Sequence, residues 1–251
     1  MPVQRHLLLA ALLTSAVAAA GASAPPPRFE PEGLIRAEDF NGGLDGWLVE
    51  QRPGGTVRSA SGSLVIEDAG GCTVWLRQAL EAPIIVTYEA TVVDRGGEHD
   101  RVSDLNCFWM AIDPAAADGN ILATSAKRTG AFAEYDALRL YYVGFGGNGN
   151  TTTRFRRYTG TGERPLLPQN DRTEAKFLLK GNRTYKVTLV AAGGRAQYFR
   201  DGELLFDYAD PAPLTRGWFG FRTVHSHLEI RNFRVWRARE ASVGGSVTEA
   251  R

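Results

Sequence analysis

A succession of short segments rich in β-branched and aromatic residues constrains the fold of this chain more than any other feature. Such residues suit pleated, half-buried strands, and turn residues separate the segments. The Asp201-Gly202 pair is a strong hairpin signal, and segments with helical periodicity are nearly absent. Many antiparallel strands joined by glycine-rich turns predict an all-β fold, a sandwich or jelly roll of two antiparallel sheets. The strand-like segments are 62–68, 72–80, 84–93, 106–113, 138–145, 151–158, 184–208, 217–224 and 228–237.

The two ends of the chain depart from this pattern. Residues 1–24 begin with a basic region, continue into an apolar run and end in small residues, which is typical of a secretory signal peptide. Residues 25–35 are interpreted as a proline-rich leader, 36–237 as one sandwich domain, and 238–251 as a disordered tail. No later segment is long and apolar enough to span a bilayer. The sequence therefore predicts a secreted or periplasmic protein with no membrane partner.

The net charge argues against a nucleic-acid partner. The chain has 29 Lys and Arg against 28 Asp and Glu, and the predicted signal peptide contains one arginine and no acid. The remaining chain is therefore neutral, whereas a nucleic-acid-binding domain has a basic excess. Cys72 and Cys107 are the only cysteines. After export they can form a disulfide, or they are two buried thiols in apolar strands.

Against this neutral background, one stretch is strongly basic. Residues 138–158 contain four arginines and no Asp or Glu. Arginine forks bind carboxylates bidentately, so an unpaired cluster predicts an acidic ligand. The alternative is structural, with Arg139, Arg156 and Arg222 paired to distant acids such as Asp104.

The chain resembles the concanavalin A-like lectin/glucanase superfamily in its opening "EDFNGGLDGW", its meander "YKVTLV…YFRDGELLFDY" and its ending "GWFGFRTVHSHLEIRNFRVWR". More narrowly, "SDLNCFWMAIDP", "GGNGNTTTRFRRY" and "GERPLLP" resemble an uncharacterised secreted family within it that is associated with polysaccharide degradation. The resemblance implies a concave sheet that holds a glycan. It also implies a structural calcium ion held by Glu38 and Asp39, as in some relatives, because carboxylates are suitable hard ligands. No cofactor is required.

The period-2 alternation of each strand predicts which side chains line that groove. Phe155 is expected to face the core, which places Arg154, Arg156 and Tyr158 on the open face. By the same reasoning Phe108 and Leu140 face the core, and the open face also receives Trp109, Arg139, Tyr141 and Arg222.

These residue types suit the cleavage of a uronate by β-elimination. An Arg or Asn neutralises the carboxylate and stabilises the enolate-like charge, while a His or Tyr moves the protons. A turn at 224–227 is expected to bring two histidines over the same groove. The catalytic candidates are His225, His227, Tyr141 and Tyr158, and the substrate-binding candidates are Arg139, Arg154, Arg156, Arg222, Asn106 and Trp109.

The sequence leaves two other functions open. One is a glycoside hydrolase or an enzyme that cleaves oxidised keto sugars, although the E-x-D-x-x-E strand of a retaining glucanase is absent. The other is a carbohydrate-binding domain without catalysis. The leading hypothesis is a monomeric polysaccharide lyase whose partner is an acidic poly- or oligosaccharide.

Overall fold

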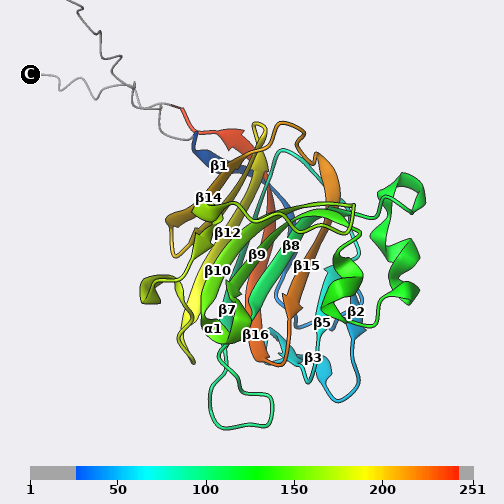
Figure 1. Ribbon diagram of the computed structural model, residues 1–251, viewed down its shortest axis with the longest axis vertical. Coiled ribbons are helices and arrows are strands. Elements are labelled where there is room, and N and C mark those ends of the chain that lie inside the picture. The colour runs from blue at the N-terminus through cyan, green and yellow to red at the C-terminus, as the bar shows by residue number, and fades with distance from the viewer. Residues whose placement is uncertain (1–26, 243–251) are drawn as a thin grey trace, which may run out of the picture.

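Two antiparallel sheets of eight strands stack face to face in the computed structural model, which describes residues 27–242 (Figure 1). The predicted all-β sandwich is confirmed. Sheet A runs in the order β14 (Glu203–Ala209), β13 (Arg195–Arg200), β12 (Thr184–Ala192), β7 (Ile84–Val92), β16 (His227–Glu240), β4 (Ser63–Glu67) and β3 (Thr56–Ala60), with β1 (Phe29–Glu38) paired to β16. Sheet B runs in the order β11 (Asp171–Arg172), β10 (Thr152–Thr159), β9 (Arg139–Gly146), β8 (Leu105–Ile112), β15 (Arg216–Thr223), β5 (Cys72–Leu76) and β2 (Trp47–Gln51), with β6 (Leu80–Glu81) paired to β15.

The helical segments are short and lie in the connections. The hairpin turn between β9 and β10 is α1 (Gly147–Asn150), in which Asn148 and Gly149 have left-handed φ angles of 53° and 68°. Glycine and asparagine adopt this conformation most readily, which explains the "GGNGN" sequence. The 3-10 helices are η1 (Ala117–Gly119), η2 (Ile121–Lys127), η3 (Phe132–Tyr135), η4 (Pro168–Asn170) and η5 (Ala175–Phe177). No helix among the described residues is long and apolar enough to cross a membrane.

The sandwich extends beyond both predicted boundaries. Strand β1 begins at Phe29, inside the segment interpreted as a leader, and β16 continues to Glu240. The two strands pair along their length, from Phe29 opposite Glu240 to Glu38 opposite Phe233. Strand β1 and the end of β16 are therefore ordered by pairing with each other. The composition of either segment alone does not reveal a pairing between residues so far apart in the sequence. The predicted signal peptide and the end of the predicted tail lie outside the described residues.

The main core lies between the sheets and is rich in aromatic rings. Phe219 and Phe221 of β15 meet edge to face at 4.7 Å, as aromatic pairs prefer. Cys72 and Cys107 are both fully buried here and are free thiols, so the disulfide alternative is wrong. Burial raises the pKa of both thiols, for Cys107 to about 12.

A second core lies on the outer face of sheet B, turned away from sheet A. Phe108, Leu140 and Trp218 project from the sheet and are buried against Ile121 and Tyr135 of the 113–138 connection. This connection lies beside β15, β5 and β2 in Figure 1, where it appears in green. Sheet B therefore carries large apolar side chains on both faces. That arrangement removes the simple alternation of apolar and polar residues from its central strands.

The predicted facing of β8 and β9 is therefore wrong. Trp109 and Tyr141 pack in the core between the sheets, whereas Phe108 and Leu140 face outward under the 113–138 connection. The facing of β10 is as predicted, with Phe155 in the main core. In β10 the inward phenylalanine lies between two arginines, so only one facing avoids burying charge in the core.

Candidate functional site

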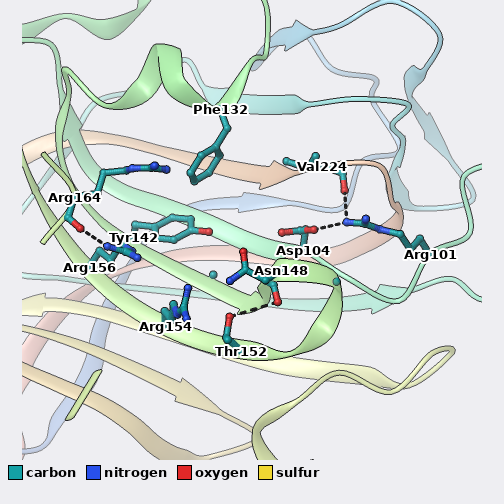
Figure 2. A pocket seen from close by; sticks show the side chains of 13 residues that line it. Arg101, Asp104, Phe132, Tyr142, Asn148, Thr152, Arg154, Arg156, Arg164 and Val224 are labelled. Atoms are coloured by element: carbon teal, nitrogen blue, oxygen red, sulfur yellow. Dashed lines mark hydrogen bonds and ion pairs between the residues drawn. The ribbon is translucent and has the colours of Figure 1, made fainter. Parts of the chain in front are cut away.

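A pocket of about 450 Å³ opens on the outer face of sheet B, over β9 and β10 and beside the start of β8 (Figure 2). Its volume lies within the range of about 300–1,000 Å³ that is usual for small-molecule sites. Its lining is strongly basic, with four arginines and one carboxylate among the described residues. The lining comes from β9 and β10, from α1, from the segment just before β8, from the residue after β15 and from the two long connections 113–138 and 160–170. The charged members are Arg101, Asp104, Arg154, Arg156 and Arg164.

The floor of the pocket is formed by Tyr142 and Gly144 of β9, which lie on the same face of the strand. A Cβ atom on Gly144 would collide with the phenol oxygen of Tyr142. The glycine therefore lets the tyrosine ring lie along the strand, with its hydroxyl directed into the pocket (Figure 2). Burial raises the pKa of Tyr142 well above its ordinary value, so the phenol is neutral near pH 7.

Two arginines of β10 point into the pocket from the adjacent strand. Arg154 is held by Asp171 of β11 through two bonds, Nε to Oδ1 at 2.8 Å and Nη2 to Oδ2 at 3.1 Å. Arg156 donates from Nη1 to the backbone carbonyl of Arg164 and forms no ion pair with a carboxylate of residues 27–242. Burial, together with repulsion from the two neighbouring arginines, lowers the pKa of Arg156. Arg156 is therefore the cation of this pocket that has no counter-ion within residues 27–242.

The single carboxylate of the pocket is already bonded to three side chains. Asp104, with a left-handed φ of 57°, accepts from Arg101 at 2.7 Å, from Ser103 at 2.5 Å and from Asn106 at 3.2 Å. Arg101 also donates to the carbonyl of Val224 at 3.1 Å and so joins the segment before β8 to the turn after β15. The Oδ1 atom of Asn106 is buried and has no hydrogen-bond partner among the described residues.

Arg222 faces the same side of sheet B as the pocket but lies under the 113–138 connection. Its side chain is fully buried, and Nη1 donates to Thr73 at 3.2 Å and to the carbonyl of Gly130 at 2.7 Å. The rings of Phe132 and Tyr135 lie 5.1 and 5.0 Å from its guanidinium carbon. Nε and Nη2 have no partner among the described residues. Arg222 therefore contacts the covering connection and does not line the pocket.

The two predicted histidines do not line the pocket, so their placement over the groove is wrong. Nδ1 of His225 lies 3.1 Å from the carbonyl of Ala69, and His227 lies 2.8 Å from Asp100 in a separate hollow between the 93–100 loop and the adjoining ends of β7, β16 and β4. The turn at 224–227 directs only Val224 toward the pocket.

The remaining candidates divide between the interior and the surface. Tyr141 is in the main core and donates to Asp210 at 2.7 Å, and Trp109 packs on its ring at 5.4 Å. Tyr158 faces the outer side of sheet B, as predicted, but is completely buried in the second core, and burial raises its pKa to about 12. Arg139 is exposed at the start of β9 and donates to the carbonyl of Thr159 at 3.3 Å.

The structural alternative proposed for Arg139, Arg156 and Arg222 is not realised, because none of the three forms an ion pair with a carboxylate of residues 27–242. Arg154, which that alternative did not include, is paired with Asp171. The sequence reasoning missed Tyr142, because it gave the open face to the preceding tyrosine. A signal was present: Gly144, two residues on, leaves room on one face of the strand for the ring of Tyr142.

Calcium binding by the N-terminal acids stays a prediction. Glu38 accepts from Arg36 at 2.9 Å and from the indole of Trp47 at 3.3 Å, while Asp39 accepts from the amide of Asn41 at 3.0 Å. Within residues 27–242, no group of three or more His, Cys, Asp and Glu side chains is arranged to hold a metal ion.

Residues 66–233 match the model of a family described as "Domain of unknown function (DUF6250)". No curated protein matches the chain. A Bacillus subtilis protein of unknown function with a galectin-like fold is 18% identical, with 85% of this chain and 100% of that chain covered and a TM-score of 0.67. The carbohydrate-binding module CBM66 from Bacillus subtilis is 13% identical, with coverages of 77% and 96% and a TM-score of 0.52. An endo-β-1,3-glucanase from Pyrococcus furiosus is 11% identical, with coverages of 83% and 95% and a TM-score of 0.52. These similarities confirm the fold, a concanavalin A-like and galectin-like sandwich.

Proposed function

We propose that this chain, which belongs to the DUF6250 family, binds an acidic saccharide in the pocket on the outer face of sheet B. The observation that carries the proposal is Arg156, a pocket arginine without a carboxylate partner among the described residues, in a lining that has four arginines and one aspartate. A partly buried cation that lacks a counter-ion is stabilised by an anionic ligand, and a guanidinium binds a carboxylate through two parallel bonds.

The aromatic rings of the pocket support a sugar as the carrier of that charge. Tyr142 lies in the floor and Phe132 in the wall, with their ring centres 5.8 Å apart. Sites of this kind combine apolar and aromatic surface with a few polar groups that fix the orientation of the ligand. The fold is shared with a carbohydrate-binding module and with a glucanase, which supports a saccharide by analogy of fold alone.

Cleavage of the bound uronate by β-elimination is the second candidate function, and the free hydroxyl of Tyr142 favours it. In that reaction a base takes the proton next to the carboxylate, a carbon–carbon double bond forms, and the bond to the leaving oxygen breaks. Arg156 would neutralise the carboxylate, and the neutral phenol of Tyr142 would protonate the leaving oxygen. The histidines predicted to act as the base lie outside the pocket. Binding is therefore the function that the geometry supports best.

Hydrolysis has less support from the pocket. The usual mechanism needs two carboxyl groups on either side of the glycosidic bond. Among the described lining residues Asp104 is the only carboxylate, and three hydrogen bonds already hold it.

The test is a panel of defined oligosaccharides titrated by calorimetry. The acidic probes are oligogalacturonate, oligomannuronate and oligosaccharides that contain glucuronate, and the neutral controls are cello- and laminari-oligosaccharides. At least one acidic probe is expected to bind, and neutral probes are expected to bind much more weakly. New absorbance from an unsaturated uronate would show that the protein also cleaves the probe by β-elimination. New reducing ends without that absorbance would indicate hydrolysis instead.

A matched pair of variants tests the role of the pocket cation. Arg156→Ala removes a charge-assisted contact worth about 1.5–3 kcal/mol, so binding of the acidic probe is expected to weaken about 10- to 150-fold. Arg139→Ala removes an exposed arginine of the neighbouring strand that does not line the pocket, and should leave the affinity unchanged. Equal binding of neutral and acidic probes, or an Arg156→Ala variant with wild-type affinity, would refute the proposal.

A further inference from the structure

The outer face of sheet B is covered over much of its area and is not an open trough. Phe108, Leu140, Tyr158 and Trp218 project from four of its strands and are all buried beneath the 113–138 connection. The pocket occupies the part of the face that this connection leaves uncovered, over β9 and β10 and beside the start of β8.

Near the start of β5, beside β15, the cover over the sheet includes a close backbone contact. A Cβ atom on Gly130 would collide with the carbonyl of Gly71, and a Cβ atom on Gly71 would collide with that of Gly130. The two segments are therefore in direct backbone contact at the start of β5. Arg222 binds the Gly130 carbonyl from below at 2.7 Å. Among the described residues, this contact blocks the direct route for a sugar from the pocket across β15 to the start of β5.

A second wall closes the pocket toward the start of β9. The guanidinium carbon of Arg164 lies 5.1 Å from the centre of the Phe132 ring, and Nε of Arg164 lies 3.4 Å from Asp136. Arg156 holds the backbone carbonyl of Arg164. The connections 113–138 and 160–170 therefore meet above the sheet, and Figure 2 shows Arg164 and Phe132 side by side over Tyr142. The opposite rim of the pocket is formed by the turn α1 and by Arg101, which is hydrogen-bonded to Val224.

From this enclosure we infer that the pocket receives the terminal residue of an acidic glycan chain and excludes interior residues. The inference rests on the proposed function of the same site. An interior sugar residue has another sugar attached on each side, so its site must be open in two directions. A terminal residue needs only one opening. The backbone contact at Gly130 and the Phe132–Arg164 pair limit the space on two sides of the pocket, so the glycan chain is taken to leave on the side of β10, where Arg154 and its partner Asp171 form the rim.

The number of protein molecules bound per glycan chain distinguishes the two modes. The probe is the acidic glycan of the panel that binds best, prepared as short, intermediate and long chains of defined length. Terminal recognition predicts one protein molecule per chain at every length. It also predicts that partial cleavage of the long polymer by an unrelated enzyme raises the binding capacity in proportion to the new ends. Interior binding predicts more protein per chain as the length grows, and little gain on cleavage.

A pair of variants tests the wall itself. Phe132→Ala removes the ring that contacts both Arg164 and Arg222, so more than one protein molecule is expected to bind each long chain. Leu122→Ala shortens a side chain of the same connection that packs on the second core away from the pocket, and one molecule per chain is expected.

The outcomes separate the inference from the function on which it rests. Occupancy that rises with chain length in the wild-type protein would overturn terminal recognition while leaving acidic-saccharide binding intact. If only one molecule of the Phe132→Ala variant still binds each long chain, the wall at Phe132 is not the cause of terminal recognition. Failure of every acidic probe to bind would overturn both.

Discussion

The buried carboxylate of Glu50 anchors the connection that encloses the pocket, and its removal should be severe. Glu50 lies in β2 and is 4% exposed. It accepts hydrogen bonds from Nε of Arg128 at 3.0 and 3.1 Å, and from Ser125 at 2.7 Å. The indole of Trp75 at 2.9 Å and the hydroxyl of Tyr135 at 2.8 Å complete its shell. Three of these four partners belong to the 113–138 connection.

Glu50→Ala leaves the guanidinium of Arg128, whose side chain is 4% exposed, without its closest carboxylate. Breaking a buried ion pair by removing one partner costs about 3–5 kcal/mol. For a chain of this size, each kcal/mol lowers the melting temperature by about 2–4 °C, so a fall of about 6–20 °C is expected. Urea unfolding measures the free energy directly, provided that the m-value stays constant.

A second variant separates the charge from the packing. Glu50→Leu combined with Arg128→Met removes both charges, and should be less destabilising than the sum of the single changes, because neither charge is left alone. A loss below about 1 kcal/mol for Glu50→Ala, in the range of an exposed pair, would contradict this account. Additive single and double variants would contradict it equally.

Three further predictions concern other parts of the molecule. Gly144→Ala should displace the ring of Tyr142 and weaken binding of the acidic probe at least about tenfold, measured by calorimetry beside a stability control. Burial acts to raise the pKa of Asp100, but hydrogen bonds from two backbone amides and a histidine outweigh it and leave the pKa lowered. The carboxylate therefore stabilises the fold above the unfolded pKa of about 3.9 and loses that effect as the pH falls through the lower folded value. In the Asp100→Asn variant, the free energy of unfolding should therefore fall less steeply as the pH is lowered below about 3.9, as measured by urea unfolding at a series of pH values. The thiols of Cys72 and Cys107 should resist alkylation near pH 8 until the protein unfolds, because burial raises their pKa and blocks access; fast labelling of native protein would refute this.

The local sequence was sufficient to predict the strands and the two arginines that β10 contributes to the pocket. The alternation of β10 predicted that Arg154 and Arg156 share a face opposite Phe155, and both line the pocket. The Asp201-Gly202 turn was equally readable, with left-handed φ angles of 52° and 83° between β13 and β14. In both cases the side chains or turn residues themselves exclude the alternative conformation.

The facing of β8 and β9 could not be read in this way. Trp109 and Phe108 are both large and apolar, as are Tyr141 and Leu140, because both faces of sheet B are buried there. The alternation along a strand shows only that the side chains of consecutive residues point to opposite faces of the sheet. Which side is the core depends on what packs against it. The sequence likewise could not reveal that the histidines lie outside the pocket.

The sequence by itself thus determined that this chain is a β-sandwich with arginines on the outer face of one strand, because strand propensity, alternation and turn chemistry act between neighbouring residues. Only the tertiary structure decided that Arg222 is buried under Gly130, while Arg156 lines the pocket with no acidic partner in the described part of the chain. It also decided that two connections meet at Phe132 and Arg164 to close the site. Those relations join residues far apart in the chain, and the packing of long loops on a sheet leaves no period in the sequence.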